Sequence, residues 1–219
     1  RTLKINIGGI SKLSKERLID ELKKIIKLPV LAKLSKDKLS LEIFLIIFPE
    51  LKNVKIFSKL NSYYKDLLKE NDFIFLLSLL VIDDNDNLDY FLYKFNISKQ
   101  NQKRMKIIDN FYKEKMTVNT FIEKNMNKVL YYHGKQAVLD ILNLRIVKSK
   151  KINKTLIELS QSYKSKTIPS MPISADLLMK KYNISEGKQL GQKLKTIEQI
   201  WVKNDFKISD QQVDNIINN

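Results

Sequence analysis

The sequence lacks cysteine and contains a single histidine, His133, among its 219 residues. Without cysteine the chain has no disulfide, no thiolate metal site and no cysteine nucleophile, which fits a reducing compartment such as the cytoplasm. With one histidine, neither a Ser-His-Asp arrangement nor a His-based zinc site can be completed in its ordinary form. We therefore expect neither of these chemistries from this chain.

Turn-forming residues are also scarce, since the sequence has only five Gly and four Pro. Strands joined by tight turns would normally require more of them, so the chain is predicted to be all-α, a multi-helix array. The longest apolar stretch, Phe73 to Ile82, is interrupted by Ser78 and is about half the ~20 residues that a membrane-spanning helix needs. It is predicted to be a buried helix, and no membrane partner is expected.

Helix boundaries follow from capping residues and apolar spacing. Ser14 is the expected cap of a first helix that ends before Pro29, and Asn71-Asp72 the expected cap of the apolar helix. Gly134 is expected to break a helical stretch, and residues 164–172, with two Pro, are expected to be a linker. The remaining helices are expected over residues 30–34, 38–47, 55–69, 88–95, 98–115, 117–132, 136–147, 153–163, 175–182, 187–203 and from residue 210.

The acidic group Asp83, Asp84 and Asp86 is similar to the start of a calcium loop. It fails as an EF-hand because the sixth position, which requires Gly, is Leu88 and the twelfth is Lys94 rather than Glu. Two-metal nucleotidyl transfer needs carboxylates beside a phosphate-holding turn, and no such turn surrounds this loop. A solvated loop is therefore expected, with no metal site in the chain.

Positive charge is the strongest remaining signal. The 40 Lys and Arg against 24 Asp and Glu give a net charge of +16 and a pI near 9.7, which predicts a negatively charged partner such as RNA, DNA or a membrane surface. Lysines that hold phosphates by charge suit recognition of a folded RNA by its shape. The candidate RNA-binding residues are Lys99, Lys103, Arg104, Lys106, Lys148, Lys150, Lys151, Lys154 and Lys188. Only four of the cations are Arg, so compositional drift and an ordinary solvated helix face stay open as alternatives.

Two stretches resemble the bacterial class II tRNA nucleotidyltransferase (CCA-adding enzyme) and poly(A) polymerase family. Ser14-Lys15-Glu16-Arg17-Leu18-Ile19-Asp20-Glu21-Leu22 is similar to the Ser-x-Glu-Arg-Ile-x-x-Glu-Leu segment of the neck, with Leu18 in place of Ile. Ala175-Asp176-Leu177, Gly187, Leu190-Gly191, Leu194, Ile197-Glu198 and Trp201 follow the family's tail pattern, with Ala175 where Gly is usual. Phe48-Pro49-Glu50-Leu51 and Tyr132-His133-Gly134-Lys135 lie between them, in the order of the family. The tail leucines, Ile197 and Trp201 also have core spacing, and Gly191 is expected to permit close helix packing.

The resemblance implies a neck remainder and helical body over residues 1–166 and a helical tail over residues 167–219. It implies that the chain holds the acceptor stem and elbow of tRNA, or another RNA, while a head domain adds CCA or A without a template. Glu16 and Arg17 match the segment that supports the nucleotide-selecting neck. The Asp-x-Asp head with its Mg and its ATP or CTP is not found in this sequence, so no cofactor and no polymerisation are expected from residues 1–219 alone.

Three alternatives stay open: the C-terminal region of a poly(A) polymerase, a stand-alone helical RNA-binding module that has lost the enzyme head, and a helical scaffold whose charge is drift. Partners beyond RNA and the head domain are not predicted, and the sequence leaves the oligomeric state open.

Overall fold

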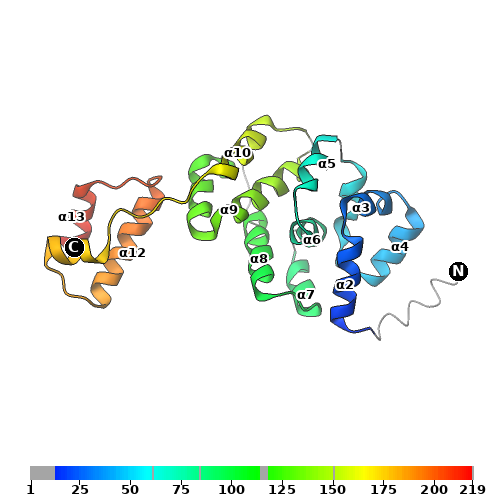
Figure 1. Cartoon of the computed structure of the whole chain (residues 1–219), viewed down its shortest axis with the longest axis horizontal. Coiled ribbons are helices and arrows are strands. Elements are labelled where there is room, and N and C mark those ends of the chain that lie inside the picture. Colours follow the sequence, from blue (N-terminus) through cyan, green and yellow to red (C-terminus); the bar gives the residue numbers. More distant parts are fainter. Residues whose placement is uncertain (1–12, 61, 84, 114–117, 150, 219) are drawn as a thin grey trace. The chain divides into compact units, whose positions relative to one another are not determined.

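The structure, a computed structural model, describes residues 13–60, 62–83, 85–113, 118–149 and 151–218. These residues form α-helices and short 3-10 helices, and no strand occurs among them (Figure 1). The all-α fold class predicted from the scarcity of turn residues is confirmed.

The chain divides into two compact units, Arg1–Met116 with Asp140–Lys154 and Thr117–Leu139 with Thr155–Asn219. Helix α9 (Glu123–Lys148) contributes residues to both. The other elements of the first unit are α2 (Lys15–Ile25), α3 (Leu28–Leu34), α4 (Lys38–Ile47), η2 (Lys52–Ser58), α5 (Ser62–Lys69), α6 (Phe73–Val81), α7 (Asn87–Lys94) and α8 (Lys99–Lys113). Those of the second are η3 (Val118–Phe121), α10 (Lys154–Ser165), α11 (Ala175–Tyr182), α12 (Lys188–Lys203) and α13 (Asp210–Asn218).

Side-chain caps start several helices where the sequence predicts them. The Arg17 N–H donates to Ser14 Oγ over 3.3 Å at the start of α2, and the Phe75 N–H donates to Asp72 Oδ1 over 3.0 Å at the start of α6. Each cap satisfies one of the backbone donors that a first helical turn leaves without a partner. Both predicted caps are confirmed.

Helix α6 is the centre of the first unit. Every residue from Ile74 to Val81 is buried, and α6 contacts η2, α7 and α8. A helix that is apolar on all sides is stable only inside a core, so the prediction of a buried helix is confirmed. Its one polar residue, Ser78, donates its hydroxyl to the Ile74 carbonyl over 2.8 Å.

Two predicted features of chain geometry are wrong. The single helix expected over residues 55–69 is instead the 3-10 helix η2 followed by the separate helix α5. Gly191 was expected to permit close packing, but a Cβ placed there would meet no atom within 4 Å. By contrast, Gly134 does interrupt the helical geometry of α9, with φ 82° and ψ 173°.

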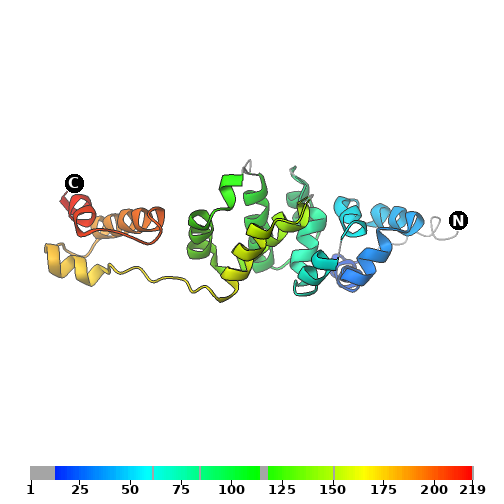
Figure 2. The same ribbon diagram turned by 90° about the horizontal axis from the view of Figure 1, so that it is seen from above.

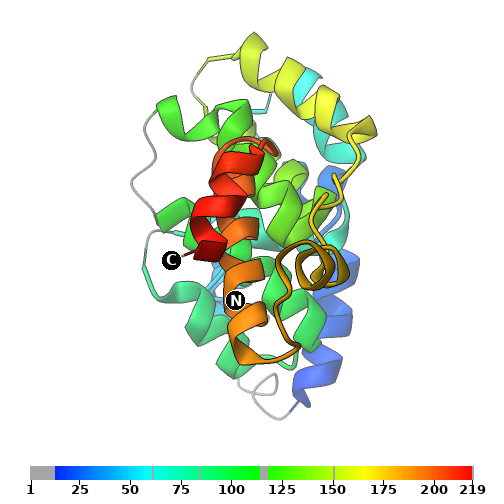
Figure 3. The same ribbon diagram turned by 90° about the vertical axis from the view of Figure 1, so that its left-hand side faces the viewer.

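The helices α11, α12 and α13 share a small core of their own. Leu178, Leu190, Ile197 and Val213 are buried in it, and α12 lies against both α11 and α13 (Figures 1 and 3). Leu190, Ile197 and Trp201 occupy the predicted core positions, whereas Leu177 is 40% exposed and the buried residue is Leu178. The predicted core position of Leu177 is therefore wrong by one residue.

The segment between α10 and α11, residues 166–174, contains no helix (Figure 2). The linker predicted over residues 164–172 overlaps most of it, and the difference is that α10 continues to Ser165.

Candidate nucleic-acid interface

Helix α8 carries three of the predicted RNA-binding lysines on one exposed face. Lys99, Lys103 and Lys106 are exposed, and their spacing of four and three residues places them side by side along the helix. Lys106 Nζ lies 3.2 Å from Asp89 Oδ1, and both side chains are about half exposed, at 53% and 55%. An ion pair this open to solvent is weak, so Lys106 can leave Asp89 and bind another anion such as a phosphate group.

Arg104 lies on the same helix but turns toward the core. Its Nε and Nη2 atoms donate to the two carboxylate oxygens of Asp140 over 2.6 and 2.8 Å. Its Nη1 atom donates to Asp72 Oδ2 over 2.5 Å. The Asp140 side chain is 0% exposed and that of Arg104 is 18% exposed. This two-bonded pairing satisfies a buried carboxylate and links α8 to α9 and to the cap of α6. Arg104 therefore faces the core and is not part of the exposed lysine face of α8.

The pKa values of this cluster reflect its pairing. Burial by itself would lower the pKa of Arg104, but the hydrogen bonds and charges of Asp140 and Asp72 outweigh burial and raise that pKa above its ordinary value. Burial would likewise raise the pKa of Asp72, yet the hydrogen bonds from Arg104 and from the Phe75 N–H lower it. Asp72 is thus held in the charged form that both of its partners need.

Lys148, near the end of α9, lies beside a cavity of about 650 Å³. Its Nζ atom is 3.7 Å from the centre of the Tyr112 ring and donates to the Ile82 carbonyl over 3.1 Å. Lys59, Asn53 and Ser149 also line the cavity. Two lysines and small polar groups line this cavity, which makes it a basic recess, and Lys59 was not among the predicted residues.

The remaining predicted residues lie on other elements. Lys151, Lys154 and Lys188 are exposed, Lys154 as the first residue of α10 and Lys188 as the first of α12. Lys150 lies outside the described residues. Glu16 and Arg17 are both exposed in the first turn of α2. The structure therefore brings Lys99, Lys103 and Lys106 together on one face of α8, turns Arg104 of the same helix toward the core, and places Lys148, Lys151, Lys154 and Lys188 elsewhere.

Sequence reasoning also missed two tyrosines on α7. Tyr90 is 61% exposed and Tyr93 is 85% exposed. The signal was present in the sequence as an aromatic pair three residues apart, set against the buried pair Leu88 and Phe91 on the other side of the helix.

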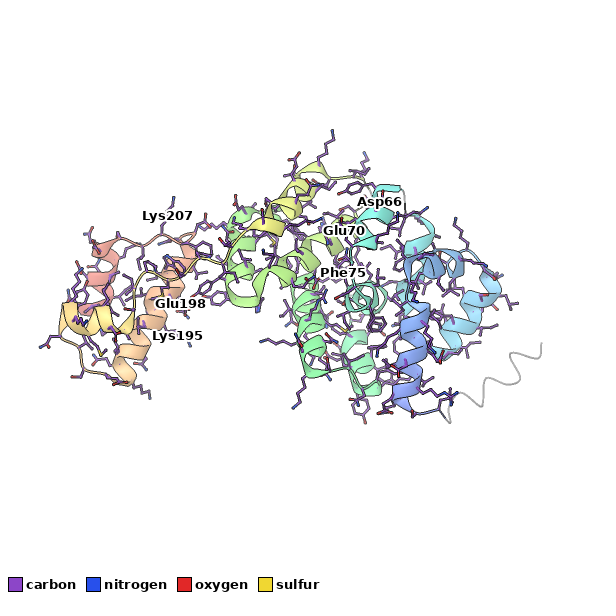
Figure 4. All side chains as sticks on the ribbon, in the orientation of Figure 1. Asp66, Glu70, Phe75, Lys195, Glu198 and Lys207 are labelled. Carbon is purple, nitrogen blue, oxygen red and sulfur yellow. The ribbon has the colours of Figure 1, made fainter. Side chains whose placement is uncertain are left out.

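In the second unit, an aromatic group connects α9 to α12. The Tyr131 ring is 5.4 Å from the Trp201 ring, and Trp201 is 4.9 Å from Phe206. The Tyr131 hydroxyl donates to Glu198 Oε1 over 2.6 Å, and this hydrogen bond, together with burial, raises the pKa of Tyr131 to about 12. A cavity of about 580 Å³ lies beside this pair and is also lined by Lys195, which Figure 4 shows on α12 together with Glu198.

A turn of unusual geometry after α12 completes this connection. Asp205 and Phe206 both have positive φ, at 58° and 64°. The Asp205 carboxylate accepts a hydrogen bond from Asn127 Nδ2 over 2.6 Å, and Asn127 Oδ1 accepts one from the Tyr163 hydroxyl, also over 2.6 Å. The left-handed turn thus brings a carboxylate back to α9.

Among the described residues, no group of three or more His, Asp or Glu side chains is placed to hold a metal ion. No helix in that part of the chain is both long enough and apolar enough to cross a membrane.

These observations define the class of the protein as all-α, with exposed lysines along one face of a helix. Comparison with protein families identifies the class more closely: the family described as tRNA nucleotidyltransferase domain 2 matches residues 66–213. The chain therefore belongs to the tRNA nucleotidyltransferase domain 2 family. The family predicted from the sequence motifs is confirmed, and the tail motif lies within the matched residues. No curated protein matches the sequence.

Proposed function

We propose that this chain is the RNA-holding portion of a tRNA nucleotidyltransferase. In this proposal it positions the acceptor stem and elbow of tRNA for a catalytic head domain that adds CCA, or A, to the 3′ end without a template. The observation that carries the proposal is the exposed face of α8, with Lys99, Lys103 and Lys106 on one side of a helix inside the matched family region. Phosphate contacts of this kind fix the position of an RNA without reading its sequence.

The proposal also includes the division of the chain into a neck remainder and body, residues 1–166, and a tail, residues 167–219. Glu16 and Arg17, both exposed on α2, would brace the nucleotide-selecting part of the neck. Mg and ATP or CTP would bind to the head domain, and the cytoplasm would be the place of action. The family description names tRNA, which supports tRNA as the RNA in this proposal.

The test is the binding of purified protein to a tRNA without its CCA end, compared with an unstructured RNA of equal length, over a series of salt concentrations. We expect tighter binding to the tRNA, with an affinity that falls steeply as salt rises. Binding that is equally weak for both RNAs would contradict the proposal. It would indicate that the net positive charge reflects amino-acid composition and not an RNA-binding surface.

A triple variant locates the contact. K99A/K103A/K106A removes three positive charges from α8, and each phosphate contact contributes about 0.7 to 0.9 to the slope of log affinity against log salt. We therefore expect the slope to decrease by about 2 to 3 if all three lysines contact phosphates. The matched control is K33A/K36A/K38A, which changes the net charge equally at three exposed lysines of α3, α4 and the turn between them. Equal effects of the two variants would show that overall charge, rather than α8, causes the binding.

A further inference from the structure

Helix α7 presents two tyrosines to solvent on one face. Tyr90 and Tyr93 are 61% and 85% exposed, and a separation of three residues makes them neighbours on the helix surface. Leu88 and Phe91, on the opposite side of the helix, are 1% and 0% exposed, so α7 is fixed in the core by its other face. Adjacent large aromatic side chains that remain outside a well-formed core indicate a binding surface.

The lysine face of α8 lies next to these tyrosines. Lys106 pairs with Asp89 over 3.2 Å and Lys113 lies 3.8 Å from Asp86, so later residues of α8 lie beside earlier residues of α7. The two helices are therefore antiparallel neighbours (Figure 1). It follows that Tyr93, near the end of α7, lies beside the beginning of α8, where Lys99 and Lys103 are exposed.

Tyr90 also forms one wall of a cavity of about 500 Å³. The same cavity is also lined by Pro49, Glu50, Lys52, Asn85, Asp86 and Asn87. The Lys52 side chain is 56% exposed, and its Nζ atom is 3.3 Å from Asp83 Oδ2. The surface thus offers an aromatic wall, a recess lined by both Lys52 and Asp86, and the lysines of the neighbouring helix α8.

Unpaired nucleobases stack on exposed aromatic rings, and this stacking tolerates any sequence because every base has a π-face. Lysines next to such rings hold the phosphates between successive bases. A base-paired stem cannot use this arrangement because its bases are already stacked on one another. The combination of exposed tyrosines with flanking lysines therefore fits single-stranded RNA.

We infer that Tyr90 and Tyr93 form a stacking platform for unpaired nucleotides of the bound RNA, with Lys99, Lys103 and Lys106 holding the phosphates beside it. The inference rests on the proposed RNA-holding function and adds to it that the RNA reaches α7 as a single strand. Lys99, Lys103 and Lys106 supply the positive charge that favours RNA over a protein partner, and Asp86 and Asp89 on the same side are paired with Lys113 and Lys106.

The test uses the full chain and two RNAs of equal length, one unstructured and one base-paired. We expect Y90A/Y93A to weaken binding of the unstructured RNA by at least about fivefold, and Y90F/Y93F to restore it, because phenylalanine keeps the ring. Binding of the base-paired RNA and the salt slope should stay unchanged, since no phosphate contact is removed. The control is L39A, which removes a large side chain that is 58% exposed on α4.

The outcomes separate this inference from the proposed function. If the wild-type protein binds neither these two RNAs nor tRNA, the proposed function fails and the platform fails with it; if it binds tRNA but not the unstructured RNA, only the platform is overturned. If the wild-type protein binds RNA but Y90A/Y93A binds the unstructured RNA equally well, the platform is overturned and the RNA-holding function stands. An equal loss for both RNAs, or a loss that phenylalanine does not restore, would overturn base stacking. Both tyrosines are exposed, so a matching circular dichroism spectrum is expected for every variant.

Discussion

At the scale of single residues, Arg104 shows how a local pattern can misplace a charge. The sequence places it between Lys103 and Lys106, and spacing along the chain groups it with these exposed lysines. Its actual partner, Asp140, is 36 residues away and is fully buried. The spacing of residues along a helix indicates only on which side of that helix each residue lies. A buried carboxylate on another helix can pair with a long side chain such as that of Arg104 and turn it toward the core. Lys99, Lys103 and Lys106 find no such partner in the core, and the structure leaves them exposed, as the sequence predicts.

The Arg104–Asp140 pair gives a stability prediction at this scale. R104A would leave the buried Asp140 carboxylate without its cation, and loss of one member of a buried pair costs about 3 to 5 kcal/mol in the free energy of unfolding. R104K should cost less, because lysine keeps the charge but loses the two parallel hydrogen bonds. Urea unfolding followed by circular dichroism measures both.

The matched control for these variants is K103A, which changes the neighbouring exposed residue. We expect K103A to stay within about 0.5 kcal/mol of the wild type, as surface substitutions usually do. A loss for R104A no greater than that of K103A would show that the ion pair contributes nothing to the fold.

At the scale of elements, the sequence predicts where helices start better than it predicts which residues of a helix face the core. Ser14 and Asp72 cap the helices that the sequence assigns to them because a cap acts through bonds to its own first turn. Leu177 and Leu178 are both apolar, and a one-residue error rotates a position by about 100° around the helix. Which of the two enters the core depends on Leu190, Ile197 and Val213, whose placement is tertiary. The break between η2 and α5 likewise has no Gly or Pro to mark it.

Replacing glycine by alanine is predicted to have opposite effects on stability at two positions inside helices. Gly134 has φ 82° and ψ 173°, a conformation that is essentially limited to glycine, so G134A should destabilise the protein by about 1 to 3 kcal/mol. Gly191 lies inside α12 without unusual φ, and a Cβ there would meet nothing within 4 Å. G191A should therefore stabilise the protein by about 0.5 to 1 kcal/mol, because alanine favours a helix interior. Thermal unfolding of the two variants side by side measures this difference. A stabilised G134A would mean that α9 can straighten through residue 134 without loss.

At the scale of the whole molecule, the sequence supplies the amount of charge but not its position. The net charge of +16 indicates a polyanionic partner, while the cations are divided among an exposed face, a buried ion pair and a basic recess. Burial and pairing decide which of these a cation joins, and both depend on residues distant in the chain. The family, in contrast, could be recognised from ordered motifs, because those motifs record core and capping positions spread over most of the fold.

Helix α9 contributes residues to both units, with its break at Gly134, and we expect the stabilities of the units to be coupled through it. Trp201 is the only tryptophan and belongs to the second unit, where its ring lies 5.4 Å from Tyr131 on α9. Asp140 is the residue at which α9 enters the first unit, and Arg104 holds it there. Tyr131 lies on the other side of the break at Gly134, and we expect loosening of Asp140 to fray α9 across that break, so that R104A lowers the urea midpoint of Trp201 fluorescence together with that of circular dichroism. K103A should leave both midpoints in place. If R104A shifts only the circular dichroism midpoint and Trp201 unfolds at the wild-type urea concentration, the two units unfold independently and α9 does not transmit stability between them.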